Sequence, residues 1–183
     1  MFIGCMLAKI IVKSMFEVFE DDRVEVCMKL YLAQHGLATT SQENAERPLN
    51  AQGREDTTRT AGFLSLFEKP KPTRIFHSGK LRAEQTANMF AEAWGRGSVQ
   101  QAEGLSPADD PKYWLDMLSE SAEDTMLVGH MPHLQRLVGL LLCNDKNKSP
   151  VLLRNSGVLC LQQDASEWQV KWYIYPALFY GEA

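Results

Sequence analysis

The sequence predicts an α/β domain built as a three-layer α/β/α sandwich, with helices on both faces of a mostly parallel mixed sheet. Two observations favour this fold class. A pattern of buried strand, short turn and helix occurs three times along the chain, and two further strand patterns close it as a hairpin. The length of 183 residues, of which 45% are hydrophobic and 23% charged, suits one domain with a sizeable core.

We expect residues 1–27 to be an N-terminal extension and residues 28–183 to form this single domain. The apolar run from Phe2 to Val12 is far shorter than the ~20 residues needed to span a bilayer. It also lacks the basic start and small-residue cleavage site of a secretory signal. The role of the extension stays open between an added strand, an added helix and a dispensable upstream start.

The first strand–turn–helix unit begins in residues 24–33, where every second residue is apolar, as is typical of a buried strand. This strand ends at Gln34-His35-Gly36. Residues 51–67 then carry apolar side chains at near-helical spacing, and Asn50 stands where an N-cap is expected. These features predict the first long helix.

The second unit is a short strand over residues 73–77 followed by a helix over residues 79–94. Ser78 is predicted to cap this helix, because a serine hydroxyl can accept from a free N–H of the first turn. Beyond it we expect a short strand around Val99 and a short helix over residues 113–118.

The third unit is a strand over residues 124–128, a turn at Gly129-His130 and a helix over residues 132–142. The hairpin then pairs residues 158–162 with residues 168–175. In such sheets ligands bind beyond the carboxyl ends of the strands. Each of the three turns at these ends carries a His or an Arg, so we predict the binding site there.

Composition limits the kinds of partner. The net charge of −4 comes with scattered basic residues, so we expect no stripe that binds a nucleic acid, and any anion site must be local. The four cysteines have neither metal-ligand nor Cys-x-x-Cys spacing, which fits a reducing cytoplasm. We therefore expect a cytoplasmic protein that binds neither nucleic acid nor membrane.

Three residues stand out at the predicted site. His35 follows the first strand, and Gly36 beside it would let a ligand approach closely. Arg82 lies in the first turn of its helix, where a positive charge opposes the helix dipole unless an anion offsets it. His130 lies at the N-terminal end of the third helix, where free N–H groups favour an anion.

Taken singly, these residues also fit ordinary roles. His35 could be a simple loop histidine, and Arg82 could be a surface arginine paired with Glu84 or Glu46. We interpret His77 and His133 as structural. The combination is more specific, because two histidines and an arginine follow three successive strands in a chain with no cysteine or serine motif for nucleophilic catalysis.

Four segments, in this order, resemble the histidine phosphatase superfamily. They are Leu30-Tyr-Leu-Ala-Gln34-His35-Gly36, Arg47-Pro-Leu-Asn-Ala-Gln-Gly53, Ser78-Gly-Lys-Leu-Arg82-Ala-Glu-Gln-Thr86 and Val128-Gly-His130-Met-Pro132. Within that superfamily, the chain is most similar to small phosphohistidine phosphatases of the SixA type, from about Met28 to the end of the hairpin. The resemblance implies a phosphoglycerate mutase-like fold.

The resemblance further implies a two-step phosphoryl transfer that needs no metal or other cofactor. His35 attacks phosphorus, and water then hydrolyses the covalent phosphohistidine. Arg82 holds phosphoryl oxygens with its planar fork, and His130 donates a further hydrogen bond as charge develops on them. The phosphate and substrate are expected to contact Gln34, Gly36, Arg47 and Ser78.

Two positions depart from the family pattern. Gln34 replaces the arginine that precedes the nucleophilic histidine, so we expect weaker phosphate binding or slower turnover, since a charge-assisted hydrogen bond is about twice as strong as a neutral one. Gly104 stands where many larger members carry a carboxylate as general acid, with Glu103 and Asp109 as nearby candidates. A phosphoramidate needs that acid least, because its imidazole can leave already protonated. This favours phosphohistidine over phosphate esters and argues against a mutase.

Three functions stay open. The leading hypothesis is a metal-independent phosphatase of phosphohistidine in a protein, with a phosphorelay or phosphotransfer component as its partner. The second hypothesis keeps the chemistry but gives it to a small phosphorylated metabolite. The third is a phosphate- or phosphoprotein-binding module that lost catalysis through Gln34, although a binder would not need the nucleophile His35.

Overall fold

A computed structural model describes residues 28–165 and 167–180 of the chain. The predicted extension over residues 1–27 lies outside these described residues. The elements in chain order are β1 (Lys29–Gln34), α2 (Ala51–Phe67), β2 (Arg74–His77), α3 (Leu81–Trp94), β3 (Ser98–Gln101), α4 (Lys112–Ser119), β4 (Thr125–Gly129), α5 (His133–Cys143), β5 (Val158–Asp164), β6 (Glu167–Ile174) and a 3₁₀ turn, η1 (Pro176–Phe179). The order predicted from the sequence is confirmed.

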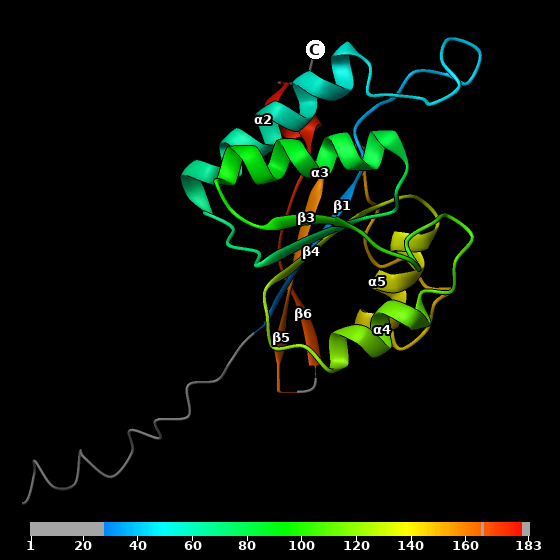
Figure 1. The fold of residues 1–183 in the computed structure, drawn as a ribbon. Coiled ribbons are helices and arrows are strands. Elements are labelled where there is room, and N and C mark those ends of the chain that lie inside the picture. Colours follow the sequence, from blue (N-terminus) through cyan, green and yellow to red (C-terminus); the bar gives the residue numbers. More distant parts are fainter. Residues whose placement is uncertain (1–27, 166, 181–183) are drawn as a thin grey trace, which may run out of the picture.

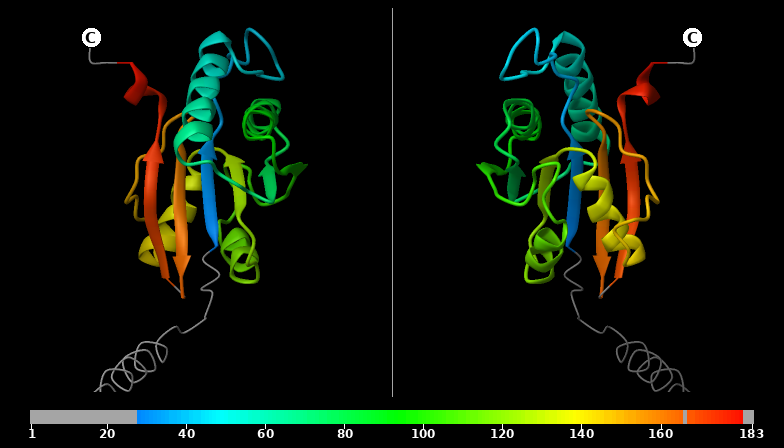
Figure 2. Two further views of the ribbon diagram at one scale, coloured as in Figure 1. Left: turned by 90° about the vertical axis from the view of Figure 1, so that its left-hand side faces the viewer. Right: turned by 90° about the vertical axis from the view of Figure 1, so that its right-hand side faces the viewer.

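The strands form one six-stranded sheet in the order β3-β2-β4-β1-β5-β6. The pairs β2–β3, β2–β4 and β1–β4 are parallel, whereas β1–β5 and β5–β6 are antiparallel. Figure 2 shows the sheet from edge to edge, with the β5–β6 hairpin at one side and β3 at the other. The predicted mixed, mostly parallel sheet is confirmed.

Helices cover both faces of this sheet, as predicted. In Figure 1, α2 and α3 lie on one side of the strands, and α4 and α5 lie on the other. Alternation along β1 divides the core accordingly: Tyr31 and Ala33 pack under α2 and α3, while Leu30 and Leu32 pack under α4 and α5. Among the described residues, no helix is both long enough and apolar enough to cross a membrane.

Two predicted helix starts have different outcomes. Asn50 caps α2 as expected, because its Oδ1 accepts a hydrogen bond from the Gly53 N–H at 2.8 Å. The predicted cap by Ser78 is wrong. Helix α3 begins at Leu81 with Lys80 as a cap residue that makes no side-chain hydrogen bond, and Gly79 turns the chain before it at φ 79°. This turn leaves the Ser78 hydroxyl free for another partner.

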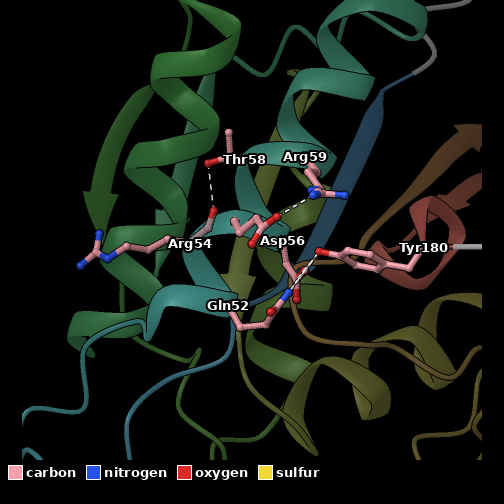
Figure 3. Close-up of polar contacts among 7 residues, drawn as sticks. Gln52, Arg54, Asp56, Thr58, Arg59 and Tyr180 are labelled. Atoms are coloured by element: carbon pink, nitrogen blue, oxygen red, sulfur yellow. Dashed lines mark hydrogen bonds and ion pairs between the residues drawn. The ribbon is translucent and has the colours of Figure 1, made fainter.

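A polar cluster fixes the end of the described chain onto α2 (Figure 3). The Tyr180 hydroxyl donates to Asp56 Oδ1 at 2.5 Å, and Gln52 Nε2 donates to the same oxygen at 2.8 Å. The Arg59 guanidinium lies 4.8 Å from the centre of the Tyr180 ring. Asp56 is only 6% exposed, and these two donors satisfy the polar group that burial would otherwise penalise.

Candidate active site

The three predicted turns meet at one edge of the sheet. Strands β1, β2 and β4 are parallel neighbours, and the register pairs Gln34 with Gly129 and His77 with Val128. The residue that follows each strand therefore emerges at the same level. The rings of His35 and His130 lie 4.8 Å apart between centroids, and Ser78 follows β2 beside them. The fold thus brings together residues that are up to 95 positions apart.

The contacts of the His35 ring define its tautomer. Nδ1 lies 2.7 Å from the carbonyl oxygen of Gly36, and Nε2 lies 3.1 Å from Nε of Arg82. A carbonyl can only accept and a guanidinium N–H can only donate, so the network assigns the ring proton to Nδ1. The lone pair of Nε2 therefore faces the Arg82 guanidinium. This lone pair accepts the Arg82 N–H here, and an anion that took over that N–H would free the lone pair and lie directly in front of it.

Burial keeps the His35 imidazole neutral. Removal from water, together with the positive charges of Arg82 and Arg47, lowers the pKa of His35 to about 4, against an opposing effect of the hydrogen bond to the Gly36 carbonyl. Protonation would place the proton on Nε2 and remove its lone pair. The depressed pKa therefore leaves the ring unprotonated and nucleophilic at neutral pH.

His130 is the second histidine of the cluster and is 2% exposed. Its Nε2 lies 2.6 Å from the Ser78 hydroxyl, which explains where the hydroxyl goes instead of capping α3. Burial lowers the pKa of His130 to about 3, with smaller contributions from His35, Arg82 and other nearby positive groups. Within the described part of the chain, its Nδ1 has no hydrogen-bond partner.

Arg82 lies in the first turn of α3 and has no acidic partner among the described residues. Neither Glu84 nor Glu46 forms an ion pair with it, so the surface-arginine alternative is not supported. Partial burial and the positive charge of Arg47 lower the pKa of Arg82. The Arg82 guanidinium thus faces His35 without a counterion from the described chain, and the charge of Arg47 lies near enough to lower the pKa of both residues, so an anion is favoured here.

Gly36 has a packing role that the sequence did not reveal. Its N–H donates to Thr86 Oγ1 at 3.0 Å, so this donor is engaged within the protein. A Cβ at Gly36 would lie 2.9 Å from both the Gly53 carbonyl oxygen and Thr57 Oγ1, too close to be admitted unless the local structure shifts. The glycine therefore lets the turn after β1 lie close to the N-terminal part of α2.

The other predicted contact residues are near His35 but differ in what holds them. Arg47 adopts φ 52° and donates from Nε to the Thr39 carbonyl at 3.1 Å, which leaves its terminal nitrogens outside that bond. Gln34 ends β1, and its carbonyl accepts from the Ser156 N–H at 3.0 Å. No hydrogen bond involves the Gln34 side chain among the described residues.

A cavity of about 520 Å³ extends from Ser78 along the loop that follows β3. Its lining includes both candidate general acids, Glu103 and Asp109, together with Asp110 and Tyr113. The Asp109 carboxylate accepts from the Ser106 N–H at 2.8 Å and so stabilises its own loop. Three of its lining side chains are carboxylates, and its lining residue Ser78 contacts His130 of the cluster.

Asn155 is a further residue of this site that no sequence motif indicated. Its Nδ2 donates to the His35 carbonyl at 2.7 Å across 120 positions of sequence. Only the Asn-Ser-Gly turn pattern before β5 marks this residue, and such a pattern indicates a turn rather than a partner.

Within the described ranges, no group of three or more His, Cys, Asp or Glu side chains is arranged to hold a metal ion.

Comparison with known proteins agrees with this geometry. Residues 30–109 match the model of the histidine phosphatase superfamily, branch 1. The resemblance predicted from the sequence is thereby confirmed. No curated protein matches the chain.

Three solved structures illustrate the fold. The protein histidine phosphatase SixA complexed with tungstate has a TM-score of 0.71 at 22% identity, covering 83% of this chain and 99% of that one. A chain from Agrobacterium tumefaciens assigned to SixA has a TM-score of 0.68 at 22% identity, covering 81% and 98%. Phosphoglycerate mutase from Bacillus anthracis has a TM-score of 0.60 at 16% identity, covering 79% and 92%. The predicted phosphoglycerate mutase-like fold is confirmed, and the superfamily match supports a phosphatase.

Proposed function

We propose that this protein is a phosphatase that removes the phosphoryl group from phosphohistidine in a protein, through a covalent intermediate on His35. One observation carries the proposal. The Nδ1 nitrogen of His35 is bound to the Gly36 carbonyl, and this leaves the lone pair on Nε2, which lies 3.1 Å from Arg82 Nε. A neutral imidazole facing a guanidinium is suited to attack a phosphorus atom whose oxygens that guanidinium binds.

The reaction has two balanced steps. In the first, His35 Nε2 forms a bond to phosphorus while the bond from phosphorus to the substrate nitrogen breaks, and the substrate imidazole leaves in its neutral form if its other nitrogen is protonated beforehand. In the second, a water oxygen attacks phosphorus, the bond to Nε2 breaks, and inorganic phosphate is released carrying both protons of the water. His35 thereby regains its lone pair.

Arg82 and His130 stabilise the charge that develops on the phosphoryl oxygens. The Arg82 fork can bind two oxygens and is the strongest donor at the site. His130 stays neutral because of burial, and when the Ser78 hydroxyl donates to Nε2, the one N–H of the ring is on Nδ1, which has no partner among the described residues. In this proposal, Ser78 fixes the orientation of the His130 ring through their 2.6 Å contact. Arg47 binds the substrate at the mouth of the pocket.

The substrate class follows from the acid chemistry. A phosphate ester needs a proton delivered to its leaving oxygen, whereas a phosphoramidate can leave already protonated. Glu103 is exposed, and Asp109 is engaged with Ser106, so neither is held over the cluster in the way a general acid requires. A small phosphorylated metabolite is the alternative, with the cavity of about 520 Å³ beside Ser78 to hold its remaining part. The two cysteines of the described chain, Cys143 and Cys160, are free thiols, which agrees with the proposed cytoplasmic location.

A substrate comparison tests the proposal. We would measure kcat/KM for phosphate release from a phosphohistidine-bearing protein, from p-nitrophenyl phosphate and from a panel of small phosphate esters, with and without EDTA. We expect the phosphoprotein to give the highest value, inhibition by orthovanadate and no effect of EDTA. A small ester as the best substrate would favour the metabolite alternative, and loss of activity with EDTA would contradict the metal-independent mechanism. Tungstate binding without turnover of any substrate would favour the binding module.

A further inference from the structure

The loop before β5 reaches the residue proposed as the nucleophile. The Ser156 N–H donates to the Gln34 carbonyl at 3.0 Å, and Asn155 Nδ2 donates to the His35 carbonyl at 2.7 Å. An isolated parallel bridge joins Gln34 and Asn155. The strand thus continues past its last regular residue along this loop, and the chain of His35 is held from the side opposite to β4.

This loop is itself fixed by two other elements. The buried Ser156 adopts φ 57°, a conformation that is unfavourable for a residue with a Cβ, and its hydroxyl lies 2.9 Å from Thr57 Oγ1 of α2. The Arg154 N–H donates to the Tyr173 hydroxyl of β6 at 2.7 Å. Residues on both sides of Asn155 are therefore anchored, and the amide is presented to His35 from a rigid support.

We propose that Asn155 is a positioning residue that fixes the main chain of His35, so that Nε2 stays aligned with Arg82. This inference rests on the proposed role of His35. The His35 N–H donates to the Gly129 carbonyl at 3.2 Å, and the ring Nδ1 is bound to the Gly36 carbonyl. The Asn155 amide completes the set as the donor to the remaining polar group, the His35 carbonyl. It is a side-chain donor to the main chain of His35, whereas the His35 N–H is held by the main chain of β4.

The chemistry of the contact demands an amide or another N–H donor at position 155. A carboxylate of the same shape would face the His35 carbonyl oxygen with a second oxygen and repel it. A displacement of about 1 Å at a reacting group can cost about 100-fold in rate. We therefore expect Asn155→Asp and Asn155→Ala to lower kcat about 10- to 100-fold at neutral pH with KM changed less than about threefold, since Asn155 has no assigned contact with the substrate.

The experiment compares these variants with Asn147→Ala, which changes an exposed asparagine on the loop after α5. Kinetics on the best substrate are combined with ¹⁵N NMR of the His35 ring and with thermal unfolding. The proposal predicts a fall in kcat and a shifted Nε2 resonance for both Asn155 variants, with a folded protein, and neither change for Asn147→Ala.

Wild-type kcat and an unchanged Nε2 resonance in Asn155→Asp would overturn the proposal. A fall in kcat explained entirely by unfolding would overturn it too. If the wild type turns over no substrate, the proposed function fails, but the NMR comparison still decides about Asn155: a resonance that does not move in either folded variant contradicts the positioning role.

Discussion

The pH at which His35 takes up a proton measures how strongly the fold keeps the imidazole neutral, with the lone pair on Nε2 free of a proton. Burial and the nearby positive charges lower the pKa of His35 to about 4, against about 6.5 for a histidine in water. At pH 5.5, about 97% of the His35 rings should then be neutral, compared with about 9% for an unperturbed histidine. The protein should retain its nucleophile well below the pH at which an exposed histidine loses it.

Proton NMR of the ring hydrogens measures this directly, because the chain has only four histidines and single substitutions can assign each of them. The signal of His35 is the one lost in His35→Asn. We expect its midpoint near pH 4, and midpoints below the ordinary value for His77, His130 and His133 as well, because burial lowers the pKa of each.

A His35 midpoint near 6.5 in the folded protein would refute this reasoning. It would mean that the ring is hydrated rather than buried between Arg82 and the Gly36 carbonyl. Histidines of unfolded chains titrate near pH 6.5 and could be mistaken for this result. Chemical shifts that report the folded state are therefore recorded at every pH.

Three further predictions concern Arg82, Gln34 and His130. Arg82→Lys removes the planar fork and the Nε–H that points at His35. We expect kcat/KM to fall about 10- to 100-fold, because a hydrogen bond to a charged group contributes about 1.5–3 kcal/mol. Wild-type kinetics in this variant would contradict the assigned role. Gln34→Arg adds a guanidinium and should raise kcat/KM about tenfold in steady-state assays, whereas no gain would mean that other contacts already bind the phosphoryl group. His130→Gln should make the unfolding free energy less sensitive to acid, because unfolded His130 takes up a proton below about pH 6.5 while the folded ring does so only near 3. Between these values His130 costs the wild type about 1.4 kcal/mol of stability per pH unit, in addition to what the other buried histidines cost both proteins. Equal losses in both proteins by urea titration at pH 7 and 4.5 would argue against burial of a neutral ring.

The elements could be predicted because each has a local cause. The alternation at β1 and the Asn50 cap of α2 depend on residues that are close in sequence. The placement of His35, Arg82 and His130 in one cluster was also predictable, since parallel strands bring the turns after their carboxyl ends to one edge.

The errors and omissions involve contacts between distant segments. Ser78 has the composition of a helix cap, but the turn at Gly79 sends its hydroxyl to His130, 52 positions away. The need for Gly36 comes from the approach of α2, and the amide of Asn155 reaches His35 from the loop before β5. Such partners depend on tertiary packing, which the periodicity of a single segment does not encode.

Trapping of the phosphorylated protein tests the central claim most directly. We would mix each of three proteins with a ³²P-labelled phosphohistidine protein and quench the reaction in alkali within milliseconds. The three proteins are the wild type, His35→Ala and the control His77→Asn. In the control, the asparagine oxygen can replace the His77 Nδ1 that accepts from the Gly79 N–H. We predict label on the wild type and on His77→Asn, stable to alkali and labile to acid as a phosphoramidate is, located on His35, and no label on His35→Ala. Phosphate release by His35→Ala at the wild-type rate, or label on another residue, would contradict the account.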